Sequence, residues 1–205
     1  MSPATKVSAR EKLLQVSLGV IREKGYEATT VDELCAAAHV TKGAFFHHFE
    51  SKEALAVAAA EHWTAVTGAL FAAAPYHKQK DPLDRLLAYV DFRRELLRGD
   101  LPDYTCFVGM MVQEVYDSNP KIREACRRSI FGHAATLEND IREARAKYAP
   151  GAEWSAEGVA LHTQAVLQGA FIVAKAGQDV KHAADSIDHL RRYLEFLFQR
   201  RKGHA

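Results

Sequence analysis

A short stretch in the first quarter of the chain gathers side chains that suit contact with DNA. Lys42, His47 and His48 bring hydrogen-bond donors, while Gly43 and Ala44 are small enough for another molecule to approach closely. The Ala44 methyl group could also touch the methyl group of a thymine base. These residue types within one short helix predict binding in the major groove of DNA.

Two short helices are expected to position these side chains. Thr30 and Glu33 have the spacing of a capping box, in which each side chain bonds the other residue's backbone N–H, so a helix over 31–38 should begin there. A tight break follows, and Thr41 can cap a second helix over 42–48. Two short helices joined in this way are typical of a helix-turn-helix, whose second helix enters the major groove.

Apolar residues recur at helical spacing along nearly the whole chain, and strand-like alternation is absent. We therefore expect an all-α protein. Further helices are predicted over 8–24, 52–73, 82–98, 106–116, 120–148, 155–176 and 182–200. Pro75 and the polar stretch 77–80 mark a break between the two halves of the chain.

Composition sets limits but does not itself indicate DNA binding. The chain has 205 residues, of which 48% are hydrophobic and 26% charged, as expected for a folded globular protein rather than a disordered one. The net charge is +1, and the first sixty residues hold seven basic and seven acidic side chains. A DNA-binding domain is usually basic, so the prediction rests on local pattern.

The three cysteines, an odd number without paired spacing, favour a reducing compartment. The N-terminal segment lacks the apolar run of a signal peptide, and the apolar stretches are shorter than a membrane span. We expect a cytoplasmic protein that does not associate with a membrane.

Enzyme chemistry is not expected. The chain has no GxSxG sequence, no phosphate-binding glycine loop and no HExxH sequence. Although there are ten histidines, no three acidic, histidine or cysteine residues have convincing ligand spacing. We predict neither a cofactor nor a bound metal.

Over residues 8–60 the chain closely resembles the TetR family of bacterial transcriptional regulators. The residues that carry the resemblance are Gly25-Tyr26, Thr29-Thr30-Val31, the run from Ala37 to Phe49 and Ser51-Lys52-Glu53-Ala54-Leu55. The resemblance implies a helix-turn-helix DNA-binding domain over 1–51 and a helical ligand-binding and dimerisation domain over 52–205. It also implies a homodimer that represses transcription from a near-palindromic operator and is released by a small-molecule effector.

The family's DNA contacts transfer by position. They fall on Thr30, Thr41, Lys42, Gly43, Ala44, Phe46, His47, His48 and Lys52. Two positions depart from the family pattern. His39 stands where the family usually has glycine, and Phe46 stands where it usually has a tyrosine whose hydroxyl meets a phosphate.

The last two helices are the candidate dimer interface. Their apolar residues are Leu161, Ala165, Gly169, Ala170, Ile172, Ile187, Leu190, Leu194, Phe196 and Leu197, with Gln168 among them. The alternative is that these faces pack on the core of their own subunit.

The ligand pocket is predicted from apolar and polarisable residues in the middle of the chain. Its candidates are Trp63, Cys106, Met110, Phe131, His133 and Lys175. Methionine is flexible enough to form an adaptable wall. The alternative for each of these residues is an ordinary place in the core.

Cys106 also has a chemical alternative. The surroundings of Cys106 and Lys175 are similar to those of the NemR-type electrophile and hypochlorite sensors within the same family, and an ammonium near a thiol favours the reactive thiolate. A redox-switched repressor is therefore a second hypothesis. A third is a helical dimer that acts through protein contacts without binding DNA.

Overall fold

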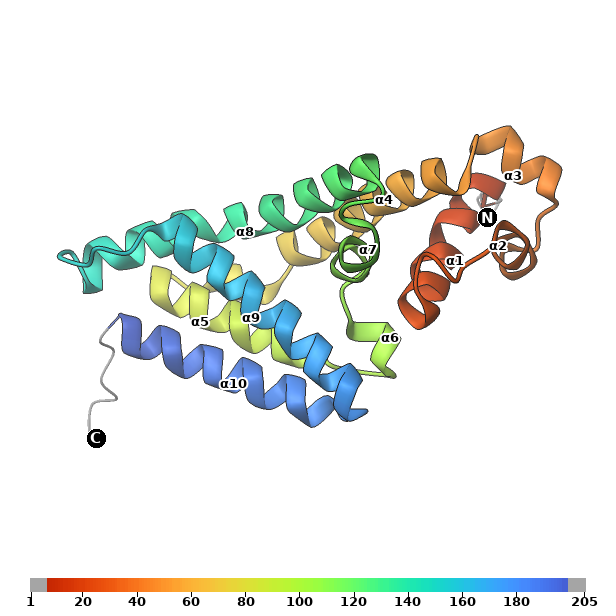
Figure 1. Ribbon diagram of the computed structural model, residues 1–205. Helices are drawn as coiled ribbons and strands as arrows, with labels where there is room; N and C mark the ends of the chain where they lie inside the picture. The colour runs from red at the N-terminus through yellow and green to blue at the C-terminus, as the bar shows by residue number, and fades with distance from the viewer. Residues whose placement is uncertain (1–6, 199–205) are drawn as a thin grey trace, which may run out of the picture. The chain divides into compact units, whose positions relative to one another are not determined.

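The computed structural model describes residues 7–198, and within this range the chain is helical, without a β-strand (Figure 1). The all-α prediction is confirmed. The elements are α1 (Ala9–Lys24), α2 (Val31–Ala38), α3 (Lys42–His48), α4 (Lys52–Ala72), the 3-10 helix η1 (Pro75–Lys78), α5 (Pro82–Glu95), α6 (Leu101–Tyr104), α7 (Phe107–Val115), α8 (Pro120–Tyr148), α9 (Ala156–Gly177) and α10 (Val180–Leu197).

Packing divides the described chain into two compact units. The first contains the residues up to Thr67 together with Cys106–Ser129, and the second contains Gly68–Thr105 and the residues from Ile130 onward. Helices α4 and α8 each contribute to both units. The predicted boundary between residues 51 and 52 remains a prediction.

The first unit is built around α1, which packs against α2, α3 and α7. Leu13, Leu14 and Ile21 of α1 are buried, and Val16 and Leu18 are partly buried. Leu34 of α2, Phe45 of α3 and Leu55 of α4 are buried as well. Each short helix therefore contributes an apolar side chain that anchors it, because a helix of seven or eight residues is not stable alone in water.

The second unit is a layer of helices in which α10 packs against both α9 and α5. Its core includes Leu83 and Tyr89 of α5, Leu167 of α9, and Ile187 and Leu194 of α10. Core residues recur every three or four positions along α5 (Leu83, Leu86, Leu87, Val90) and α10 (Ile187, Leu190, Leu194), which is the spacing that places side chains on one face.

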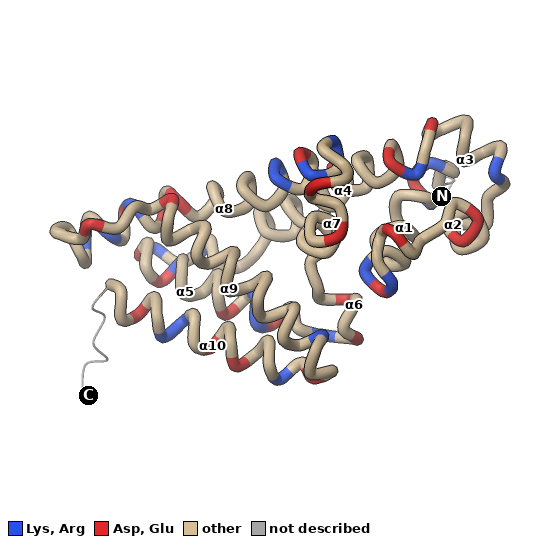
Figure 2. Tube along the Cα trace, viewed as in Figure 1, with Lys and Arg blue, Asp and Glu red and all other residues tan. Residues whose placement is uncertain are grey.

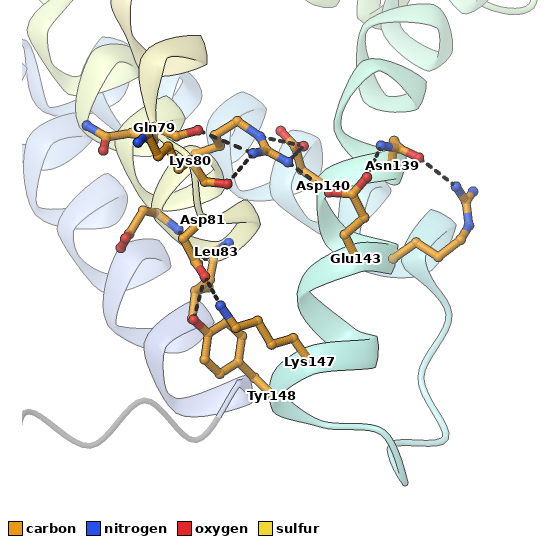
Figure 3. A network of polar contacts seen from close by, with 12 residues as sticks. Gln79, Lys80, Asp81, Leu83, Asn139, Asp140, Glu143, Lys147 and Tyr148 are labelled. Atoms are coloured by element: carbon orange, nitrogen blue, oxygen red, sulfur yellow. Dashed lines mark hydrogen bonds and ion pairs between the residues drawn. The ribbon is translucent and has the colours of Figure 1, made fainter.

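The N-terminus of α5 is held by the carboxylate of Asp81. It accepts backbone hydrogen bonds from Leu83 at 2.9 Å and Asp84 at 3.2 Å. It also accepts hydrogen bonds from the Lys147 ammonium and the Tyr148 hydroxyl, each at 2.6 Å (Figure 3). Although burial raises the pKa of Asp81, these hydrogen bonds outweigh it and hold the pKa below its ordinary value.

Arg85 forms a second link between the same two helices. Its guanidinium lies 2.8 Å from Asp140 and 2.9 Å from Glu143, both on α8 (Figure 3). It also donates to the backbone carbonyls of Gln79 and Lys80. These contacts fasten the end of α8 to the start of α5.

Several predicted helix bounds were wrong. Helix α5 ends at Glu95 rather than at 98; Gly99 then turns the chain with a positive φ of 81°, and Asp100 caps α6. Helix α10 begins at Val180 rather than at 182, because the Asp179 side chain accepts from the N–H of Lys181 and caps the helix. The predicted end of this last helix lies outside the described residues.

Segment 52–78 is long and apolar enough to cross a membrane by length and composition. In the protein, the first half of α4 instead buries Leu55, Ala56, Ala59 and Ala60 in the first unit. The first half of α4 therefore builds core with its apolar residues, whereas Val66 and Leu70 in the second half are 50% and 45% exposed.

Candidate DNA-binding surface

Helix α3 has one buried and one exposed side. Phe45 is fully buried, and Phe49 just after the helix is 5% exposed. Phe46 is 55% exposed, and the imidazoles of His47 and His48 are exposed beside it, with ring centroids 4.9 Å apart. The apolar anchors therefore present Phe46 and both histidines to solvent.

The start of α3 is capped as the sequence predicted. The Thr41 hydroxyl accepts a hydrogen bond from the backbone N–H of Ala44 at 3.1 Å. Thr41, Lys42 and Gly43 are all exposed. A Cβ on Gly43 would meet only the Thr41 hydroxyl, at 3.8 Å, so the protein itself does not require a glycine there. This front remains open to a partner.

Lys42 forms an ion pair with Asp32 at the start of α2, with 2.7 Å between ammonium and carboxylate. The pair raises the pKa of Lys42 through the hydrogen bond to Asp32. Both side chains are more than half exposed. An exposed pair of this kind adds little to stability, so Lys42 could exchange Asp32 for a phosphate at small cost.

The turn between α2 and α3 departs from ordinary backbone geometry at His39. This residue has φ 54° and ψ 47°, which is the left-handed region. Its N–H closes α2 by donating to carbonyls of the last turn. Glycine adopts this conformation at lower cost than a residue with a Cβ, so the chain tolerates a strained histidine at the turn.

The capping box at the start of α2 is confirmed. The Thr30 hydroxyl accepts from the N–H of Glu33 at 3.2 Å, and the Glu33 carboxylate accepts from the N–H of Thr30 at 2.8 Å. The hydrogen bond from Lys24, followed by those from Thr30, lowers the pKa of Glu33 to about 2. In the free protein, the Thr30 hydroxyl therefore has an internal partner.

Lys52 is also engaged within the protein. Its ammonium donates to the backbone carbonyls of Tyr26 and Thr29, each at 3.0 Å, and lies 3.4 Å from that of Glu27. It also sits 4.3 Å from the centre of the Tyr26 ring. In the free protein Lys52 ties the α1–α2 loop to α4, and its predicted phosphate contact remains a prediction.

The structure adds Glu114 of α7, which sequence reasoning did not assign to this surface. Its carboxylate accepts hydrogen bonds from the backbone N–H groups of Tyr26, at 3.2 Å, and Glu27, at 3.0 Å. A Cβ at Gly25, where φ is 95°, would lie 2.7 Å from the carboxylate. Gly25 is therefore needed both for its backbone conformation and for this close approach. No local pattern signals the contact, because the partners are far apart in sequence.

Figure 2 shows basic and acidic residues interspersed on α1 to α3 rather than a purely basic face. This agrees with the balanced charge of the first sixty residues. Any attraction to DNA must arise from the particular side chains that reach a phosphate or a base.

The six predicted ligand residues are divided between the units. Trp63, Cys106 and Met110 belong to the first unit, while Phe131, His133 and Lys175 belong to the second. Their role in a common pocket remains a prediction.

In the first unit, Trp63 lies 6.1 Å from the Phe107 ring, measured between ring centroids. Cys106 is the N-cap residue of α7, and its sulfur accepts from the N–H of Gly109 at 3.3 Å. Cys126 is buried, and burial raises the pKa of its thiol to about 12. Cys106 is therefore the more accessible of these two thiols.

The predicted dimer face divides between core and surface. Ile187, Leu190 and Leu194 are buried within their own subunit, so the alternative of ordinary core packing is correct for them. They point inward because α10 packs on α5 and α9. By contrast, Ile172 is 48% and Phe196 83% exposed.

Comparison with known proteins identifies both parts of the chain. A family model described as "Bacterial regulatory proteins, tetR family" matches residues 13–59. A model described as "Tetracyclin repressor-like, C-terminal domain" matches residues 82–190, which is more than half of the chain.

Individual proteins agree with the family models. The HTH-type transcriptional repressor NemR of Escherichia coli is 28% identical over 157 residues, which are 71% of this chain and 73% of NemR. Two other curated regulators match over shorter stretches, and the chain spans 20% and 49% of their lengths.

Solved structures extend the likeness to the whole fold. The regulatory protein TetR from Rhodobacter sphaeroides has a TM-score of 0.79 and 25% identity, covering 90% of this chain and 97% of that one. A cysteine mutant of the TetR-family regulator CifR, solved with a 26-base-pair operator, has a TM-score of 0.75 and 17% identity, covering 93% and 98%. The helix-turn-helix geometry and the two family matches together place this chain in the TetR family of bacterial transcriptional regulators, whose members are not enzymes.

Proposed function

We propose that the protein is a repressor that binds a near-palindromic operator as a homodimer and leaves it when a small-molecule effector binds. The observation that carries this proposal is the exposed front of α3, where two core phenylalanines hold Phe46, His47 and His48 toward solvent. A surface of this kind suits the major groove of DNA. Such a regulator would work in the cytoplasm, where bacterial DNA is found.

The proposed contacts fall into two classes. Lys42, and Lys52 if it leaves its carbonyl partners, would bind phosphates and give affinity that falls steeply with salt. Ala44, His47 and His48 would meet base edges and give specificity. Thr30, Thr41 and Gly43 would lie against the sugar–phosphate backbone of the DNA. Phe46 lacks the hydroxyl that would reach a phosphate.

The exposed strip of α9 and α10 supports the homodimer. Ile172 and Val173 of α9, and Tyr193 and Phe196 of α10, are large apolar residues left in contact with solvent. These side chains are spread along the α9–α10 hairpin, since Tyr193 contacts His162 in the first half of α9, whereas Ile172 and Val173 lie near its end. Exposed apolar side chains along two packed helices suit an extended interaction surface. A two-fold pairing through this strip would present two recognition helices to successive turns of DNA, about 34–36 Å apart.

Sedimentation of wild type and of two charge insertions tests the dimer. We expect Phe196→Asp to produce monomers, because it places a charge in the proposed interface. The matched control is Phe131→Asp, which changes an exposed phenylalanine on α8 and should leave the dimer intact. Monomeric wild-type protein, or equal effects of both variants, would contradict the proposed interface.

Selection of bound sequences from a random duplex pool, at two salt concentrations, tests DNA binding. We expect a near-palindrome to be enriched, more strongly at the lower salt concentration. If folded, dimeric protein enriches no sequence at either concentration, repression is rejected and a protein partner becomes the better explanation.

Variants then assign the contacts. We expect Lys42→Ala to weaken binding to all sequences and to reduce the salt slope by about 1, as loss of one phosphate contact should. His47→Ala should instead change which bases are preferred. Lys78→Ala removes an exposed lysine from η1 in the second unit and serves as the control, with unchanged affinity and sequence preference.

A further inference from the structure

The guanidinium of Arg93 lies among aromatic rings within the second unit. It sits 5.2 Å from the centre of the Phe71 ring and 5.8 Å from that of Phe171. Both phenylalanines are largely buried, and Arg93 itself is partly exposed. The charged group therefore lies against two apolar rings, on a side chain that is partly exposed.

Arg93 forms no ion pair within residues 7–198, unlike other arginines of the same unit. Arg85 pairs with Asp140 and Glu143, Arg94 with Asp188, and Arg191 with Asp91. A partly buried charge is costly when nothing of opposite sign compensates for it. The next residue, Arg94, does have a carboxylate partner, Asp188 of α10, so the lack of one at Arg93 is particular to that side chain.

The polar groups around Arg93 are neutral. The hydroxyl of Tyr89 lies 2.9 Å from Nε2 of His133 and accepts a hydrogen bond from the Gln164 amide at 3.2 Å. Burial, and then the positive charge of Arg93, lower the pKa of His133 to about 4. Burial also raises the pKa of Tyr89. At neutral pH, none of these groups supplies the negative charge that Arg93 lacks.

The residues combine two kinds of recognition. A guanidinium binds a carboxylate through two parallel hydrogen bonds, and this pairing is stronger than one between neutral groups. The Phe71 and Phe171 rings offer apolar contact to whatever the carboxylate carries. A cationic ligand would be repelled, and a neutral one would leave the guanidinium uncompensated.

We propose that Arg93, flanked by Phe71 and Phe171, binds the carboxylate of a small organic acid with an apolar body, and that such acids are the effector class. Tyr89 and His133 lie beside Phe71, with ring centroids 5.8 Å and 4.5 Å from its ring, and Gln164 is hydrogen-bonded to Tyr89. The role as effector rests on the proposed function, whereas binding of the acid by Arg93 does not.

Matched pairs of acids and amides test the charge requirement. Acetate, butanoate, benzoate and phenylacetate are titrated into the full-length protein by calorimetry, alongside acetamide, butanamide, benzamide and phenylacetamide. We expect at least one acid to bind at least tenfold more tightly than its amide. In NMR spectra, the Nε–Hε signal of Arg93 should shift with the acid and not with the amide.

Two variants test the residue. Arg93→Gln should weaken binding of the preferred acid at least tenfold, while Arg94→Gln, which removes the same charge one position away, should leave it unchanged. Arg93→Lys keeps a positive charge but loses the planar fork, so it should bind the acid several-fold more weakly than wild type. This variant also provides the test if Arg93→Gln does not fold.

The proposal is overturned if no acid binds more tightly than its amide, or if the preferred acid binds Arg93→Lys or folded Arg93→Gln as tightly as wild type. Operator selection separates this failure from failure of the proposed function. An enriched palindrome without acid binding would reject the acid site alone. Acid binding that depends on Arg93, without any enriched sequence, would reject repression alone.

If both activities are present, the acid should release wild-type protein from its operator and should not release Arg93→Gln. Release of both to the same extent would show that the effector acts elsewhere, which overturns the proposed effector class.

Discussion

The carboxylate of Glu114 accepts a hydrogen bond from the backbone N–H of Tyr26, although the two residues are 88 positions apart. Lys52 binds the same loop through the carbonyls of Tyr26 and Thr29. One carboxylate and one ammonium therefore hold the backbone that leads from α1 into α2. The orientation of the helix-turn-helix within its unit depends on side chains from α4 and α7.

Replacing Glu114 with glutamine should weaken this attachment. An amide offers one acceptor oxygen, so only one of the two backbone N–H groups keeps its partner. We expect the free energy of unfolding to fall by about 1 kcal/mol, measured by urea denaturation. Glu124→Gln is the control, because Glu124 pairs only with arginines of its own helix near the surface. Equal losses in the two variants would contradict the role assigned to Glu114.

Replacing His39 with glycine should stabilise the protein. His39 has a left-handed backbone, which glycine adopts without a Cβ clash. We expect the free energy of unfolding to rise by about 0.5–1 kcal/mol, less than the full cost of the left-handed form because glycine also loses more entropy on folding. His47→Gly, which places glycine within α3, should lower stability instead. Destabilisation by His39→Gly would show that the imidazole contributes more than the strain costs.

Replacing Phe46 with tyrosine should tighten operator binding. Phe46 is exposed on α3, so a hydroxyl added at its ring would be free to meet a phosphate. One hydrogen bond to a charged group is worth about 1.5–3 kcal/mol, which corresponds to about tenfold or more in affinity. Fluorescence anisotropy with the selected operator measures the change. Phe131→Tyr adds the same hydroxyl to α8 and should have no effect, and an unchanged affinity for Phe46→Tyr would reject the predicted contact.

The stability of the second unit should fall on mild acidification because of His133. Its pKa is lowered to about 4 in the folded protein, from an ordinary value of about 6.5. As the pH falls from about 6.5 to about 4, the unfolded chain takes up a proton that the folded protein does not. Between these two pKa values the uptake of this proton lowers stability by up to about 1.4 kcal/mol per pH unit, and the loss levels off below the folded pKa.

His133→Gln can keep a hydrogen bond to Tyr89 but does not titrate, so its stability should depend less on pH over this range. The imidazole signals of His133 in NMR spectra give the pKa directly. An imidazole that titrates near pH 6.5 would contradict the expected burial effect.

Replacing Cys106 with serine tests the hypothesis of a redox-switched repressor. The Cys106 sulfur accepts the capping hydrogen bond at the N-terminus of α7, and its side chain is partly exposed. If the protein is redox-switched, hypochlorite or a reactive aldehyde should release wild-type protein from the operator but not Cys106→Ser. Cys126→Ser is the matched control and should respond as wild type does, because Cys126 is buried. A Cys106→Ser protein that responds normally would reject this switch.

Local patterns were enough to predict the helix-turn-helix. The capping box of Thr30 and Glu33, the Thr41 cap and the paired core residues Phe45 and Phe49 all act within a few residues of one another. Because the interacting residues are only a few positions apart, their spacing can be recognised in the sequence. Short elements such as α6 were missed because four residues contain less than two turns of periodic signal.

What the sequence by itself determined is the all-helical class, the two capped helices and the family to which they belong, because hydrogen bonds and apolar periodicity between near neighbours specify them. Only the tertiary structure decided that Glu114 and Lys52 hold the α1–α2 loop, that Ile187 and Leu194 face inward while Phe196 does not, and that Arg93 lies between Phe71 and Phe171. Each of these depends on which helix packs beside which. The packing of the helices is determined by the burial of many apolar side chains together, so it cannot be predicted from any one spacing in the sequence.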